Sequence, residues 1–87
     1  MSLMQRYEGP SISPASVWSK AKIFAERHKG LCPTKEDIVK MEGKDYVKEL
    51  QPWVNEQVTE SISAALEIKF LKEEKENGTV RYQALEI

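Results

Sequence analysis

Apolar residues recur at three- and four-residue spacing after Ser13, which predicts an amphipathic helix over residues 14–29. Ser13 can cap free N–H groups, and Pro14 at the first helical position sacrifices no hydrogen bond. Gly30 suits the left-handed residue that follows a helix. The predicted apolar face carries Val17, Ala21, Phe24, Ala25 and His28.

A second apolar stripe predicts a longer helix that begins at Pro52 and ends between Glu67 and Leu71. The stripe consists of Val54, Val58, Ile62, Ala65 and Leu66. With 100° per residue and this stripe inward, the opposite side of the helix displays Glu56, Glu60, Ser63 and Glu67. We therefore expect an acidic outward face.

A shorter helix is expected between these two. Thr34 stands three residues before Asp37, which resembles a capping box, and Gly43 should end the helix that follows. Residues 45–50 could form one further helical turn.

The dipeptide Asn77-Gly78 predicts a tight β-hairpin, because both residues tolerate positive φ values. Counting outward from this turn pairs the flanking residues. Glu74 opposite Arg81 is then a complementary cross-strand pair. The other predicted pairs are Lys75 with Val80, Glu73 with Tyr82, and Leu71 with Ala84.

This order of elements predicts an α+β fold of three helices, or four, followed by a C-terminal hairpin. Residues 14–87 form the expected domain and residues 1–13 an arm. With 87 residues, 40% of them hydrophobic, the chain fits a single core. It resembles the winged-helix arrangement, a variant of helix-turn-helix, over about residues 13–87. The resemblance rests on element order, on the start of the second helix at Thr34, and on the Asn77-Gly78 wing.

The winged-helix resemblance implies that the third helix enters the DNA major groove while the wing touches the DNA backbone. Two features of this sequence oppose that role. The formal net charge is −1, whereas nucleic-acid binders usually carry a basic footprint. The predicted outward glutamates would also face phosphates. A groove-reading third helix is therefore disfavoured.

Residues suited to catalysis are few. His28 has no second histidine beside it, so we expect a packed or half-buried structural role. Cys32 is the only cysteine, which excludes an intrachain disulfide, and it lacks any motif of a nucleophile. We expect no catalytic, cofactor or metal site. No apolar run approaches the roughly 20 residues of a membrane span, and a cytoplasmic or nuclear location is expected.

The leading hypothesis is a non-catalytic module that binds a protein, with a second copy of itself as one option. Exposed apolar residues can mark an interface, although the arm or residues 43–52 could instead cover Trp53 and Ile23. The expected interface residues are Trp53, Ile23, Glu56, Glu60, Glu67, Leu85 and Ile87.

The alternative is a DNA-binding transcriptional regulator that uses the basic first helix and the wing. Its expected contact residues are Lys20, Lys22, Arg27, Lys29, Lys72, Lys75 and Arg81. An accessory subunit of a larger enzyme is a third possibility. Neither a membrane nor a small molecule is an expected partner.

Overall fold

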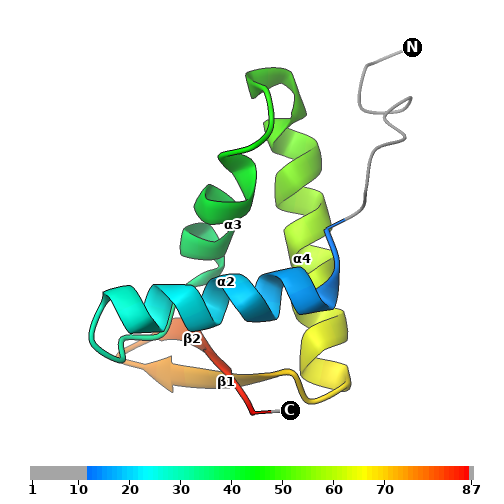
Figure 1. Ribbon diagram of the computed structural model, residues 1–87. Coiled ribbons are helices and arrows are strands. Elements are labelled where there is room, and N and C mark those ends of the chain that lie inside the picture. Colours follow the sequence, from blue (N-terminus) through cyan, green and yellow to red (C-terminus); the bar gives the residue numbers. More distant parts are fainter. Residues whose placement is uncertain (1–11, 87) are drawn as a thin grey trace.

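The computed structural model describes residues 12–86 and contains three α-helices, one 3₁₀ turn and a two-stranded antiparallel sheet (Figure 1). The predicted α+β fold, three helices followed by a C-terminal hairpin, is confirmed. The elements are α2 (Pro14–Arg27), α3 (Lys35–Gly43), η1 (Lys48–Leu50), α4 (Gln51–Glu67), β1 (Leu71–Glu76) and β2 (Thr79–Ala84).

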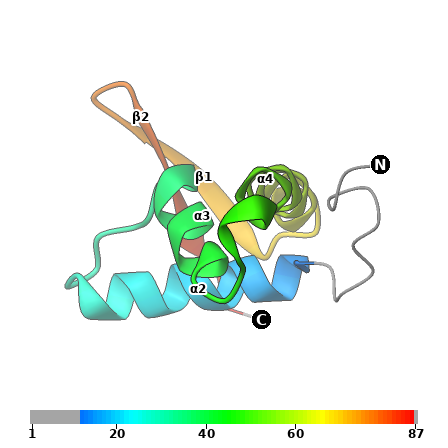
Figure 2. The same ribbon diagram turned by 90° about the horizontal axis from the view of Figure 1, so that it is seen from above.

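Helices α3 and α4 lie side by side, and α2 crosses them near the end that faces the hairpin (Figures 1 and 2). The core lies where the three helices and the start of β1 meet. Its fully buried members include Val17 of α2, Ile38 of α3, Val54 and Val58 of α4, and Leu71 of β1. Burial of these side chains contributes about 1.5–3 kcal/mol each.

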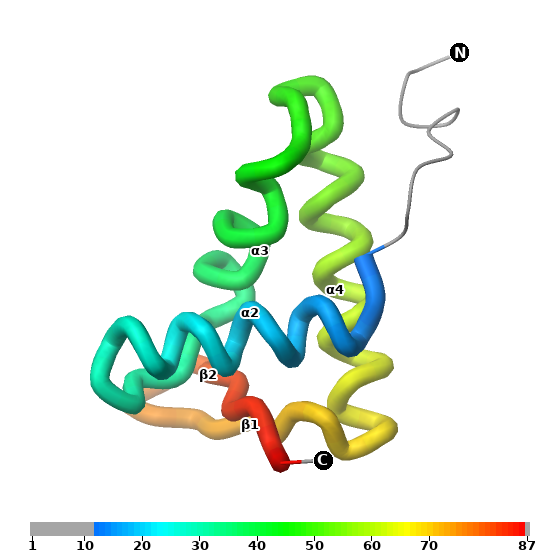
Figure 3. Tube along the Cα trace, viewed as in Figure 1, coloured from blue at the N-terminus to red at the C-terminus, as the bar shows by residue number. Residues whose placement is uncertain are grey.

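The chain packs on the domain from the first described residue. Ile12 is buried in the core, and its carbonyl oxygen accepts a hydrogen bond from the Ser61 hydroxyl of α4. Figure 3 accordingly shows the N-terminal end of α2 beside α4. Residues 1–11 of the predicted arm lie outside the described part of the chain.

Helix α2 begins as predicted, with the Ser13 hydroxyl accepting from the Ser16 N–H and Pro14 at the first position. It ends at Arg27, two residues before the expected position. Lys29 already has a left-handed φ of 56°, ahead of Gly30 at 90°. The Gly30 N–H then bonds to the Ala25 carbonyl oxygen across 2.8 Å, a pattern that closes a helix end.

The second helix begins with the predicted capping box. The Thr34 hydroxyl accepts from the Asp37 N–H, and the Asp37 carboxylate accepts from the Thr34 N–H. The helix ends at Gly43, as expected. Of residues 45–50 only Lys48–Leu50 forms a helical turn, and this turn is of the 3₁₀ type.

Helix α4 begins one residue before Pro52 and ends within the expected interval, at Glu67. Val54, Val58, Ile62 and Ala65 are buried, and Leu66 is half-buried at the edge of the stripe. The predicted inward side of the helix is confirmed.

The hairpin has the predicted register at every pair. Asn77 and Gly78 have φ values of 52° and 82°, as a turn of this kind requires. On its other side β2 is held by the connection between α2 and α3, because the Tyr82 N–H donates to the Pro33 carbonyl oxygen across 2.8 Å.

Candidate interaction surfaces

A shallow groove runs between the C-terminal half of α2 and the outer side of α3, and we call it the α2–α3 groove. It consists of two adjoining hollows of about 200 and 180 Å³ that share Arg27, Met41 and Lys44. The other lining residues are Lys20, Ile23, Phe24, His28, Asp37, Lys40 and Asp45. Apolar side chains of both helices thus lie among cationic ones.

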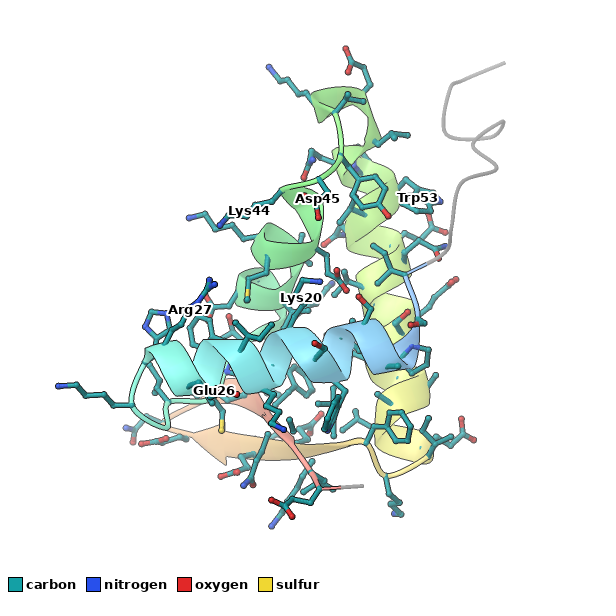
Figure 4. The ribbon with its side chains drawn as sticks, viewed as in Figure 1. Lys20, Glu26, Arg27, Lys44, Asp45 and Trp53 are labelled. Atoms are coloured by element: carbon teal, nitrogen blue, oxygen red, sulfur yellow. The ribbon has the colours of Figure 1, made fainter. Side chains whose placement is uncertain are left out.

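The cations of the groove come from two separate segments. In Figure 4, Lys20 and Arg27 project from the side of α2 that faces α3, while Lys44 and Asp45 lie at the far end of α3. Glu26 lies on the other side of α2, toward the hairpin. The fold therefore gathers positive charge on a surface of a chain whose net charge is −1.

A buried carboxylate holds the two walls of the groove together. Glu42 of α3 is 5% exposed and accepts from the Ser16 hydroxyl across 2.7 Å. It also accepts from the Lys20 ammonium across 3.0 Å, which is the ion pair found within residues 12–86. Lys20, one of the predicted nucleic-acid contacts, thus has a structural partner.

The outward face of α4 is acidic, as predicted. Glu56, Glu60 and Glu67 are exposed. Their neighbours on this face are polar as well, since Asn55, Thr59 and Ser63 are also exposed. This face therefore offers carboxylates and small polar groups but little apolar area.

Trp53 and Ile23, the predicted apolar contacts, do not form one surface. Trp53 is half-buried and packs against Tyr46 with ring centroids 5.3 Å apart. Residues 43–52 thus cover it in part, which was one of the two alternatives for this side chain. Ile23 is half-buried on α2 and lines the α2–α3 groove, beside the cations that were assigned to nucleic acid.

The cations of the hairpin stand among carboxylates or are bonded to a backbone carbonyl. Lys72 and Lys75 are exposed on a strand that also carries Glu73, Glu74 and Glu76. Arg81 stands opposite Glu74 in the register, yet its guanidinium donates to the Cys32 carbonyl oxygen across 2.7 Å. Its role within the domain is to tie the hairpin to the connection after α2.

Burial raises the pKa of the Cys32 thiol above its ordinary value of 9.0, and the nearby Glu74 carboxylate raises it further. The Arg81 guanidinium acts in the opposite direction, and Glu76 adds to the rise. The shift reduces the fraction of thiolate, whereas a nucleophilic cysteine needs the opposite shift.

Leu85, which follows β2, is bonded to α2 and to Phe70 through its backbone. The Trp18 indole N–H donates to the Leu85 carbonyl oxygen across 2.6 Å, and the Leu85 N–H donates to the Phe70 carbonyl oxygen across 2.9 Å. A second copy could pair with Leu85 only after these bonds were released. Lys22 lies over the Trp18 ring, 5.2 Å from its centroid. Ile87, also predicted at the interface, lies outside the described residues.

The prediction of a packed or half-buried His28 is wrong. Its side chain is exposed and stacks on the Phe24 ring, with centroids 4.0 Å apart. His28 is the residue that follows α2, and it lies at the margin of the α2–α3 groove, where no other element covers it enough to bury it. Lys29, which follows, is exposed too.

Comparison with protein-family models, curated proteins and solved structures gives no match for this chain. Within residues 12–86, no three histidine, cysteine or acidic side chains are grouped to hold a metal ion. No helix in the same range is both long and apolar enough to cross a membrane.

Sequence reasoning missed the residues of α3 that line the groove. Lys44 stands four residues after Lys40 and three after Met41, a spacing of neighbours on one helix face that was present in the sequence. It also missed three exposed apolar side chains outside the groove, Leu31, Val47 and Ile68, which are 45, 57 and 51% exposed.

Proposed function

We propose that this domain is a non-catalytic, winged-helix-like module that binds another protein. The observation that carries the proposal is the acidic outward face of α4, with Glu56, Glu60 and Glu67 exposed. In a winged-helix DNA reader this face would meet phosphates, and DNA presents about one negative charge per 1.7 Å of its axis. Repulsion therefore opposes that geometry.

The winged-helix interpretation itself is supported by one further contact. Winged helices usually place a strand between their first two helices, beside the wing. Here the Pro33 carbonyl oxygen accepts from the Tyr82 N–H of β2, so the connection after α2 makes one backbone bond at that position. This single backbone bond lies where a third strand would pair with the hairpin.

Duplex DNA is the second candidate partner, and the cations of the α2–α3 groove favour it. Arg27 and Lys44 are exposed and share the groove with Lys40. The wing cations give this candidate less support, because Arg81 is bonded to Cys32 and the two lysines stand among glutamates.

The test is affinity capture from a nuclease-treated extract of the native source, followed by calorimetry of the purified domain with the captured protein. We expect saturable binding of a protein that survives the nuclease. In parallel, the domain is titrated with duplex DNA at two salt concentrations. DNA affinity that falls steeply with salt, together with loss of all captured protein on nuclease treatment, would overturn the proposal.

A further inference from the structure

The α2–α3 groove combines an apolar floor with a cationic rim, and this pairing specifies the chemistry of a ligand. The floor consists of Ile23, Phe24 and Met41, all half-buried, and Arg27 and Lys44 stand exposed at the rim. We infer that the groove binds a short acidic segment of another protein that carries apolar side chains. This inference rests on the proposed function and assigns it a site.

The charges of the groove favour an acidic ligand. Arg27 comes from α2 and Lys40 from α3, Lys44 directly follows α3, and all three are exposed. Two carboxylates also line the groove: Asp37, which accepts from the Thr34 N–H across 3.0 Å but keeps its charge, and Asp45 at one end. Three cations against two carboxylates leave the groove with one positive charge in excess, apart from the Lys20–Glu42 pair. This excess would steer carboxylates toward the groove and favour one register of a bound segment.

The floor favours a protein segment over nucleic acid. Phe24 and Met41 present half-buried apolar surface between the cations. A leucine or phenylalanine side chain of a peptide would remove that surface from water, at about 25 cal/mol per Å² of apolar area. A phosphate backbone has no group that could do so, and methionine at a binding surface adapts readily to peptide side chains.

A second copy of this chain fits the groove less well. The exposed face of α4 could pair its carboxylates with Arg27 and Lys44. However, that face presents asparagine, threonine and serine between its glutamates. None of the described residues on this face would fill the apolar floor. The ligand needs acidic and apolar side chains together, which this face of α4 does not offer.

The experiment uses a fluorescein-labelled synthetic peptide of 15 residues with glutamate and leucine at helical spacing, and a second peptide with lysine in place of each glutamate. Fluorescence anisotropy should show saturable binding of the acidic peptide alone. The variant R27E/K44E reverses two rim charges and should weaken binding at least about tenfold.

The matched control is K72E/K75E, which makes the same change of charge on the hairpin and should alter binding by no more than about twofold. All four side chains are exposed, so both variants are expected to fold. Met41→Gln tests the floor, because it keeps the side-chain length and the net charge. Removal of this apolar contact should weaken binding about threefold or more.

Four outcomes would overturn the inference: equal losses in the two charge variants, no binding of the acidic peptide, tighter salt-sensitive binding of a 20-base-pair duplex, or wild-type self-association that R27E/K44E abolishes. Failure of the proposed function is recognised separately. If R27E/K44E still captures the same protein as the wild type, the domain binds proteins elsewhere and the groove assignment alone falls.

Discussion

Glu42 of α3 accepts a hydrogen bond from the ammonium of Lys20 on α2, with 3.0 Å between the two atoms. The two side chains are unequally buried, since 6% of the Glu42 side chain and 27% of the Lys20 side chain is exposed. This contact joins the two helices whose outer sides form the α2–α3 groove. Because the two side chains differ in burial, removing one should change the free energy of unfolding more than removing the other.

Loss of Lys20 should cost more than loss of the charge on Glu42. In Lys20→Met the buried carboxylate keeps only the Ser16 hydroxyl, and we expect the free energy of unfolding to fall by about 1–3 kcal/mol. In Glu42→Gln the ammonium can be hydrated, so the expected loss is about 1 kcal/mol or less. Urea unfolding measures both values. Equal losses would contradict the assignment of Glu42 as the buried partner.

Gly43 should resist substitution because of Gln51. A Cβ at position 43 would lie 2.5 Å from the Gln51 Oε1. The Gln51 side-chain amide donates to the carbonyl oxygens of Gly43 and Tyr46, each across 3.1 Å. Gly43→Ala should therefore destabilise the domain by about 1 kcal/mol. This is the opposite of the usual effect, because alanine ordinarily stabilises a helix relative to glycine.

A second background checks this explanation. In the Gln51→Ala protein the clash and the hydrogen bonds are both absent, so Gly43→Ala should become neutral or stabilising. A double-mutant cycle from urea unfolding gives the coupling between the two positions. The same loss in both backgrounds would contradict a role for Gln51.

Gly78 should be required for its backbone conformation alone. Its φ is 82°, and an added Cβ would meet open space. Gly78→Ala should lower the free energy of unfolding by about 1 kcal/mol. The control is Asn77→Gly, which keeps a residue that tolerates the φ of 52° and should change stability little. Thermal unfolding measures the stability of both variants. Equal stability of Gly78→Ala and Asn77→Gly would contradict the turn assignment.

The Cys32 thiol should react slowly with iodoacetamide in the folded protein. Its raised pKa leaves less thiolate at pH 8.5 than the same thiol has after urea unfolding. Glu74→Gln removes a charge that raises the pKa, so it should speed alkylation, whereas Arg81→Gln should slow it. Identical rates in all folded variants would contradict the electrostatic assignment.

The same thiol predicts how stability depends on pH. The folded pKa exceeds the unfolded one, so the unfolded chain loses this proton first as pH rises. The free energy of unfolding should therefore fall as pH rises above the ordinary value of 9.0. Tyr82 has a pKa raised by burial and then by Glu73 and Glu36, which extends the decline above 10.0. Cys32→Ser should remove the first part of this dependence.

Elements governed by neighbours in sequence were predicted well. The hairpin register follows from the turn at Asn77 and Gly78, because both residues can adopt positive φ and each further pair is one residue away. The capping box at Thr34 likewise joins two residues that are only three positions apart in the sequence. The inward side of α4 follows from its helical period. The end of α2 was misplaced by two residues, because Lys29 adopts a left-handed conformation that is rare for lysine.

The exposed glutamates of α4 were thus determined by the sequence, because one helix with one apolar stripe leaves a single outward side. The α2–α3 groove was decided only by the tertiary structure. Arg27 and Lys44 are far apart in sequence and become neighbours only because α2 crosses α3, and the bond from Lys20 to Glu42 joins the same two helices. That crossing depends on how Val17, Ile38 and their neighbours fill one core, which no local pattern encodes.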